Sequence, residues 1–164
     1  TVKPTAKPTA TPVSGKALFG DFSAKDVKGN TVTNSVFSKA DVTMVNIWAS
    51  FCGPCAEEMP DLAALNSEYK GQGFQVVGII LDAADKNGNV DNAALADAKD
   101  VISSTGANYT HIIPSAAMFG AYLNKVSSVP TTVFVNSKGE IIGSAYVGAK
   151  SKTQWAKIIE DKLG

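Results

Sequence analysis

The two cysteines of the chain, Cys52 and Cys55, have the type and spacing that most directly allow chemistry. A thiol pair three residues apart can exchange with a disulfide, because one thiolate attacks a sulfur and the second thiol releases the bound half. Zinc sites use the same spacing but need four ligands, and the sequence adds only His111 to the pair. A bridge across so short a loop stabilises a fold only slightly, so a plain structural disulfide is the weaker alternative.

The residues around the pair predict a strand that ends before it and a helix that begins at it. Val42–Trp48 is a mostly apolar run, which predicts a buried strand. A helix N-terminus stabilises a thiolate. Cys52 lies before the helix, so it is expected to be the more exposed cysteine and to attack, whereas Cys55, one turn inside the helix, resolves the mixed disulfide. Gly53 lets the loop close tightly, and Pro54 suits the first helical turn. The inward face of this helix is expected to carry Met59, Leu62, Leu65 and Tyr69, with a kink at Pro60 and an end near Gly71.

The remaining patterns predict an α/β domain. Turn residues at 28–30 and 137–139 each separate two apolar runs, which predicts one hairpin near each end of the domain. Strands and helices alternate between the hairpins, which favours a mixed sheet with helices on both faces. The last helix is expected to begin with a capping box of Ser151 and Gln154. The expected strands are 21–27, 31–36, 74–81, 109–113, 131–136 and 140–147, and the other helices are 92–104, 115–123 and 151–163.

Composition and charge exclude some functions and divide the chain. The 15 basic and 15 acidic residues balance, so no net field favours nucleic acid, which is not an expected partner. No apolar stretch reaches the roughly 18 residues that a membrane-spanning helix needs. Residues 1–16 are rich in Thr, Pro, Ala and Lys, which predicts a flexible tether to a membrane anchor, with a frayed end as the alternative. Residues 17–164 are long enough for one folded domain.

Three segments resemble thioredoxin-like proteins. The stretch from Asn46 to Cys55, Asn-Ile-Trp-Ala-Ser-Phe-Cys-Gly-Pro-Cys, resembles their active-site segment, and Ala-Glu-Glu-Met-Pro after it resembles the TlpA/ResA-like branch. Val-Pro-Thr-Thr at 129–132 is similar to the cis-proline segment of the family. The 22–30 stretch resembles the N-terminal hairpin of the same branch. The resemblance covers most of residues 18–163 and implies a thioredoxin fold with an added N-terminal β-hairpin and a helical insertion.

The same resemblance implies roles for residues around the cysteines. Pro130 is expected to be cis and to lie beside the redox pair, and Val129 is expected to offer its backbone to an extended substrate. An ordinary trans proline at the start of an edge strand is the alternative for Pro130. Phe51 stands where the family usually has tryptophan, which keeps an aromatic surface but loses the indole donor. The residues expected to contact substrate are Val129, Phe51, Gly53, Pro54 and Trp48, although Trp48 also fits a plain core position.

A proton acceptor for the second cysteine is also implied. Asn46 stands where cytosolic thioredoxins carry a buried Asp, and an amide does not titrate. Glu58, by its position in the motif, is the first candidate for this acid, and a solvated helix residue is its alternative. Asp82, at the end of a predicted strand, is the second candidate, and a turn residue is its alternative. His111 is expected to be a surface or strand-end residue and not a catalyst.

The function implied by the resemblance is that of a bacterial, extracytoplasmic thiol–disulfide oxidoreductase, most simply a disulfide reductase. It implies protein disulfides as substrates, a membrane thiol carrier as electron donor, a location at the outer face of the cytoplasmic membrane, and a monomer. No cofactor or metal is expected beyond the redox-active disulfide of Cys52 and Cys55. An oxidase or isomerase on the same fold is the main alternative. A copper chaperone needs a wider cysteine spacing, and a peroxiredoxin-like peroxidase needs a Thr and a Pro ahead of its cysteine where this chain has Ser50 and Phe51.

Overall fold

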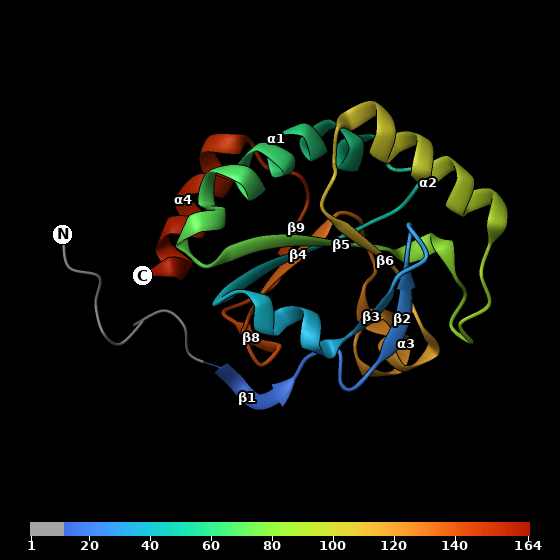
Figure 1. The fold of residues 1–164 in the computed structure, drawn as a ribbon, viewed down its shortest axis with the longest axis horizontal. Helices are drawn as coiled ribbons and strands as arrows, with labels where there is room; N and C mark the ends of the chain where they lie inside the picture. Colours follow the sequence, from blue (N-terminus) through green and yellow to red (C-terminus); the bar gives the residue numbers. More distant parts are fainter. Residues whose placement is uncertain (1–11) are drawn as a thin grey trace.

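The computed structural model describes residues 12–164, and within them nine strands form one mixed sheet (Figure 1). The strand order across the sheet is β1-β8-β7-β4-β5-β6-β2-β3, and β9 pairs with β7 beside this path. The central strand β4 is fully buried, as its apolar run predicts. The strands are β1 (Pro12–Ala17), β2 (Ser23–Asp26), β3 (Thr31–Thr33), β4 (Val42–Trp48), β5 (Phe74–Ile80), β6 (Thr110–Ile113), β7 (Thr131–Asn136), β8 (Glu140–Ile142) and β9 (Tyr146–Val147).

The middle of the sheet is parallel and its flanks are antiparallel. β5 pairs in parallel with β4 and β6, whereas β7 runs antiparallel to β4 and β2 antiparallel to β6. Strands β2 and β3 form the expected N-terminal hairpin, which attaches to the sheet through β6. The prediction of a mixed α/β sheet with an added hairpin is therefore confirmed.

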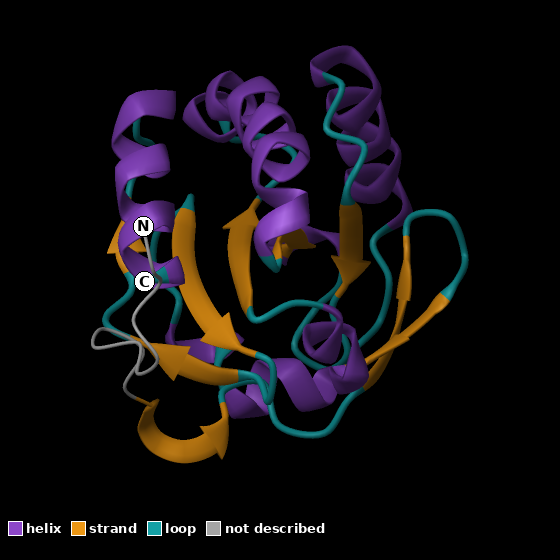
Figure 2. Ribbon diagram, turned by 60° about the vertical axis from the view of Figure 1, so that its left-hand side comes forward, coloured by secondary structure: helices purple, strands orange, loops and turns teal. Residues whose placement is uncertain are grey.

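The helices lie on both faces of this sheet (Figure 2). α1, α2 and α4 contribute to one buried cluster and α3 to the other, together with the 3₁₀ helix at Asn34–Lys39. The connections β4-α1-β5 and β5-α2-β6 advance in the same direction across the sheet, so their right-handed crossovers place both helices on one face. None of the helices in residues 12–164 has the length and apolarity to cross a membrane. The helices are α1 (Gly53–Tyr69), α2 (Asn92–Thr105), α3 (Ala116–Ala121) and α4 (Lys152–Leu163).

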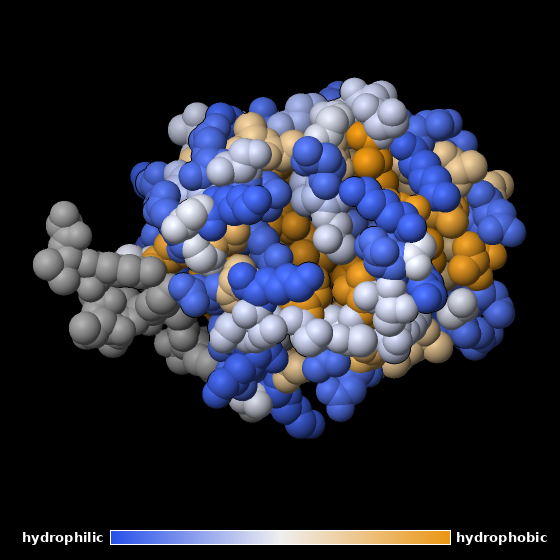
Figure 3. All heavy atoms as spheres, in the orientation of Figure 1, coloured by the Kyte–Doolittle hydropathy of each residue, from blue (hydrophilic) through white to orange (hydrophobic). Residues whose placement is uncertain are grey.

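Two apolar clusters hold the layers together, one on each face of the sheet. The first lies beneath α1 and α4 and includes Trp48, Met59 and Trp155 along with both cysteines. The second includes Phe19, Phe37 and Phe119. On the face drawn in Figure 3 hydrophilic residues dominate, and apolar ones show only as separate smaller areas. Most large apolar side chains are therefore buried in the core, and the few that are exposed indicate surfaces that can contact other molecules.

The predicted capping box of the last helix is present, and a second helix is capped by an aspartate. The Ser151 hydroxyl accepts from Gln154 N while the Gln154 side chain accepts from Ser151 N, which completes the capping box of α4. Asp91 caps α2 by accepting from Ala94 N at 3.0 Å. α1 continues through Pro60 to Tyr69 and carries its buried face on Met59, Leu62, Leu65 and Tyr69, as expected.

Three boundaries differ from the sequence predictions. Residues 12–16, assigned to the tether, belong to strand β1, which pairs with β8, so the folded domain begins earlier; the rest of the tether lies outside the described residues. Residues 34–36, expected to be strand, begin a 3₁₀ helix capped by Thr33. The predicted strand 140–147 divides into β8 and β9, because Gly143 takes a positive φ of 73° that ends the extended run.

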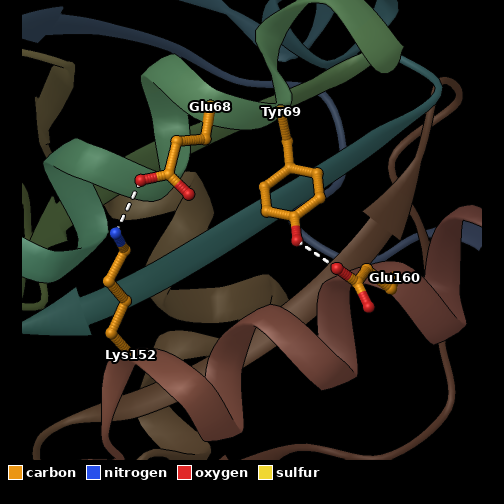
Figure 4. Close-up of polar contacts among 4 residues, drawn as sticks. All are labelled: Glu68, Tyr69, Lys152 and Glu160. Carbon is orange, nitrogen blue, oxygen red and sulfur yellow. Dashed lines mark hydrogen bonds and ion pairs between the residues drawn. The ribbon is translucent and has the colours of Figure 1, made fainter.

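Side-chain contacts also fasten α4 to the C-terminal end of α1 (Figure 4). The Tyr69 hydroxyl donates to Glu160 at 2.5 Å, and Lys152 forms an ion pair with Glu68 at 2.6 Å. The bond to Glu160, aided by burial, raises the pKa of Tyr69 to about 12. The exposed Lys152–Glu68 pair adds little stability by itself. Together the contacts fix the helix that carries Trp155, whose indole reaches the redox site.

Candidate active site

The redox pair lies at the junction of β4 and α1, as the sequence predicts. Cys52 and Cys55 form a disulfide across a Cα–Cα distance of 5.3 Å. Cys52 is the N-cap of α1, and its sulfur accepts from Cys55 N at 3.2 Å. Cys52 is 8% exposed and Cys55 is fully buried. An incoming group therefore reaches the sulfur of Cys52 first, and the helix N-terminus stabilises a thiolate there.

The segment before β7 lies against this disulfide. The Val129–Pro130 peptide bond is cis, as expected, and the Val129 carbonyl oxygen lies 3.7 Å from the sulfur of Cys52. Pro130 is buried, and its carbonyl accepts from Gly148 N at 2.8 Å, which ties it to the residue after β9. Val129 is half-buried and flanks the exposed side of Cys52, where an extended peptide can lie.

The surface around Cys52 is partly apolar and is hollowed on one side. Phe51 is 77% exposed, and Gly53 and Pro54 are exposed beside it, so all three can contact another molecule. A cleft of about 140 Å³, here called the Asp82 cleft, runs from Phe51 to Val129. Its lining residues are Ala49, Phe51, Leu81, Asp82, Val126, Ser127, Ser128 and Val129.

Glu58 is buried one helical turn after Cys55, with 3% of its surface exposed. Residues three apart on a helix are neighbours, so its carboxyl group lies on the same face as the Cys55 thiol. Oε1 accepts from the Trp155 indole N–H at 2.9 Å and from Lys150 N at 3.2 Å, and Oε2 accepts from the Asn46 amide at 3.1 Å. The solvated position considered as the alternative for Glu58 is therefore wrong.

Burial raises the pKa of Glu58, and the hydrogen bonds from Trp155, Lys150 and Asn46 only partly offset it. All three donors favour the carboxylate, since an N–H group cannot accept a hydrogen bond from the protonated carboxyl group. A carboxyl group with a raised pKa holds a proton to a higher pH than an ordinary carboxyl group and can still release it. This is the property that a proton acceptor for a buried thiol needs.

A polar row crosses the sheet below α1 at the level of Glu58. Thr132, Asn46, Gly78 and His111 are register partners on β7, β4, β5 and β6. Asn46 also donates to the Thr132 hydroxyl at 3.1 Å, while its own Oδ1 is buried with no hydrogen-bond partner among the described residues. A Cβ atom at Gly78 would overlap the His111 ring, so the missing side chain makes room for the imidazole.

His111 and Trp48 correct two sequence predictions. His111 is fully buried, not at the surface, because the gap over Gly78 admits its ring. Its Nδ1 accepts from the Trp48 indole at 3.2 Å, and the imidazole Nε2–H donates to the Ala107 carbonyl at 2.9 Å. Trp48 is fully buried in the cluster that contains both cysteines, so it takes the core position given as its alternative and has no exposed surface to offer a substrate.

Burial lowers the pKa of His111 to about 4, so the contribution of His111 to the stability of the protein decreases in acid. The unfolded chain binds a proton near pH 6.5 and the folded state only near pH 4, so the free energy of unfolding decreases as pH falls through this window. We expect the His111 contribution, taken as the difference in the free energy of urea unfolding between the wild type and His111→Gln, to decrease by roughly 1–3 kcal/mol between these pH values. His111→Gln should show a smaller loss, and identical curves for the two proteins would contradict this prediction.

Asp82, the second candidate acid, is engaged elsewhere. Its Oδ1 accepts from Ser50 N at 2.9 Å and its Oδ2 from the Ser50 hydroxyl at 2.5 Å. These bonds fix the loop two residues before Cys52. Asp82 also lines the Asp82 cleft together with Phe51 and Val129, the two residues that flank Cys52 there.

Sequence reasoning missed the partners of Glu58. No sequence pattern connects the Trp155 indole or Lys150 N with Glu58, or Thr132 with Asn46 beside it. Trp155 lies 97 residues from Glu58 in the sequence, so no local pattern connects them. The one available signal was an indole on an apolar face, since a buried indole N–H needs an acceptor.

Comparison with known proteins gives a family and close agreement in fold. Residues 13–159 match the family model Redoxin. The chain is 30% identical over 143 residues to thioredoxin-like protein YneN of Bacillus subtilis, covering 87% of this chain and 75% of YneN. It is 26% identical over 123 residues to thiol-disulfide oxidoreductase ResA of Bacillus subtilis, covering 74% of this chain. The chain spans only 62% of the length of that ResA protein.

A solved structure shares the fold over nearly the whole chain. The thiol:disulfide interchange protein of the thioredoxin family from Chlorobium tepidum TLS superposes with a TM-score of 0.70, covering 98% of this chain and 100% of that one. Its sequence identity of 24% supports the fold alone. A family match over most of the chain, a 30% identical relative and the Cys-x-x-Cys disulfide lead to the same conclusion: the chain belongs to the Redoxin family and is a thioredoxin-like thiol–disulfide oxidoreductase.

Proposed function

We propose that this protein is an extracytoplasmic reductase of protein disulfides. The observation that carries the proposal is the contrast between the two sulfurs. Cys52 reaches the surface at a helix N-terminus, and the buried Cys55 lies one turn from a buried carboxyl group with a raised pKa. The first arrangement suits a nucleophile and the second a resolving thiol.

The reduced protein would act in two exchange steps. The Cys52 thiolate attacks one sulfur of the client disulfide, a Cys52–client disulfide forms, and the other client sulfur leaves as a thiolate that takes a proton. The Cys55 thiol then gives its proton to the Glu58 carboxylate, and the Cys55 thiolate attacks the sulfur of Cys52. The second client sulfur leaves, so two electrons pass to the client and the Cys52–Cys55 disulfide remains.

A dithiol donor has to reduce the Cys52–Cys55 disulfide before the next cycle. We propose that a membrane thiol carrier supplies these electrons at the outer face of the cytoplasmic membrane. The Thr, Pro, Ala and Lys composition of the first residues supports a tether to this surface. The ResA relatives named as thiol-disulfide oxidoreductases support the reaction class. We propose that the protein works as a monomer and needs no metal or other cofactor.

The equilibrium reduction potential of the Cys52–Cys55 pair tests the direction of this reaction. It can be measured in dithiothreitol or glutathione buffers from tryptophan fluorescence, because Trp48 packs in the cluster that contains both cysteines. A reductase is expected to have a potential near or below about −250 mV. A value above about −180 mV would point to an oxidase or isomerase, and the absence of a two-electron transition would contradict the redox function itself.

A further inference from the structure

We propose that the Asp82 cleft binds a lysine or arginine side chain next to the attacked cysteine of the client, an inference that rests on the proposed function. The cleft is lined by Phe51, which precedes Cys52, and by Val129, whose carbonyl oxygen lies 3.7 Å from the sulfur of Cys52. At about 140 Å³ it is far smaller than small-molecule sites, which measure roughly 300–1,000 Å³. It has room for about one side chain of an extended peptide.

The charge in the cleft selects the occupant. Asp82 is half-buried, and within residues 12–164 no lysine lies within ion-pair distance of its carboxylate. Its hydrogen bonds come from Ser50, which supplies no positive charge. A carboxylate with no cation of its own in a largely apolar recess is complementary to a cationic side chain from outside.

The walls of the cleft suit the rest of such a side chain. Leu81, Val126 and the exposed Phe51 ring offer apolar surface to a methylene stem. The same ring can hold a cation over its face while the charge reaches Asp82. Glutamate in this position would meet like charge, and a neutral polar side chain would gain neither contact.

The position of the cleft relative to Val129 limits which client residue can enter it. A peptide that pairs with the Val129 backbone is extended, and its side chains alternate between its two faces. The client cysteine has to reach the sulfur of Cys52, which lies 3.7 Å from the Val129 carbonyl oxygen. The side chain that enters the cleft therefore belongs to a residue within one or two positions of that cysteine.

The experiment compares disulfide peptides that differ only at the residues flanking one cysteine. The flanking residues are Lys, Gln, Leu or Glu in the four peptides. The rate constant for reduction of each peptide by the reduced full chain is measured by quenched flow, with the products separated by chromatography. We expect the Lys peptide to react about two to five times faster than the Gln peptide at low salt, with the Glu peptide slowest. The preference should shrink at about 0.5 M salt, where charges are screened.

Asp82→Asn is the informative variant, because an amide can keep both hydrogen bonds to Ser50 while losing the charge. The ratio of the Lys rate to the Gln rate should fall to about one in this variant. The ratio between peptides cancels any effect of the substitution on the Cys52 thiol itself. Glu57→Gln is the matched control, since it removes an exposed charge from α1 outside the cleft and should keep the ratio.

Each other outcome has one meaning. Equal reduction of all peptides, fastest reduction of the Leu peptide, or a Lys preference that survives Asp82→Asn would overturn the cleft assignment and leave the reductase proposal standing. If the wild type reduces none of the peptides, the proposed function fails, and the cleft assignment fails with it.

Discussion

Replacing Cys52 with serine is expected to abolish disulfide reduction, lowering the rate by more than about a thousandfold. Cys52 is the more accessible of the two cysteines, with 8% of its surface exposed, and its position at the N-terminus of α1 stabilises the attacking thiolate. Cys55 is fully buried and cannot replace it as the first nucleophile. The measurement is the turnover of a disulfide substrate with dithiothreitol as electron donor, with circular dichroism to verify that the variant folds.

Cys55→Ala is the matched comparison. This variant keeps the nucleophile and loses the resolving thiol, so it should stop after the first exchange and accumulate a Cys52–client disulfide. Mass spectrometry of the non-reduced protein detects this adduct. An adduct on Cys55 in the Cys52→Ser protein, or full turnover of either variant, would contradict the assignment of the two roles.

Replacing Glu58 with glutamine is expected to slow the resolving step by about a hundredfold at neutral pH. The Cys55 thiol has to lose its proton before it attacks, and glutamine cannot accept one. The wild-type rate should rise with pH as Glu58 ionises, at a pH above the ordinary value because burial raises its pKa. The variant should instead accelerate only at alkaline pH, where the Cys55 thiol ionises without help. Stopped-flow fluorescence after mixing the reduced protein with a disulfide peptide measures the rate.

The site can accept this substitution with little rearrangement. The glutamine oxygen can keep the bonds from Trp155 and Lys150. Its amide can donate to Asn46 Oδ1, which is buried with no partner among the described residues, if the Asn46 amide turns over. Glu57→Gln, one residue earlier and exposed, is the control that removes a similar charge without touching Cys55 or its neighbours. Unchanged rates and an unchanged pH profile in Glu58→Gln would exclude Glu58 as the proton acceptor.

The stability of the two proteins should also diverge with pH. The folded state holds the Glu58 proton to a higher pH than the unfolded chain, whose carboxyl group titrates near 4.5. The folded state therefore binds more protons between that pH and the raised pKa, and the free energy of unfolding falls as pH rises through this window. Glu58→Gln has no proton to bind at this position, so this pH dependence is absent from the variant. Urea unfolding should therefore show that the variant gains stability relative to the wild type as pH increases.

The framework of this protein follows from local sequence patterns. An apolar run followed by Cys-Gly-Pro-Cys predicts a buried strand and a helix with the redox pair at their junction, and both are present. The capping box of α4, the N-terminal hairpin and the cis bond before Pro130 also follow from short patterns or from the family resemblance. Such features depend on residues close together in the chain, so local physical chemistry predicts them.

Which polar groups meet below α1 depends on how distant parts of the chain pack together. Trp155 reaches Glu58 from 97 residues away, and His111 enters the core because Gly78, on the neighbouring strand, has no side chain. Asp82 accepts hydrogen bonds from Ser50, which lies 32 residues away in the sequence. Asp82 also lines the Asp82 cleft. These contacts form where separate strands and helices pack against one another. Burial and hydrogen-bond partners then set the proton affinity of Glu58 and His111, which the residue types alone do not determine.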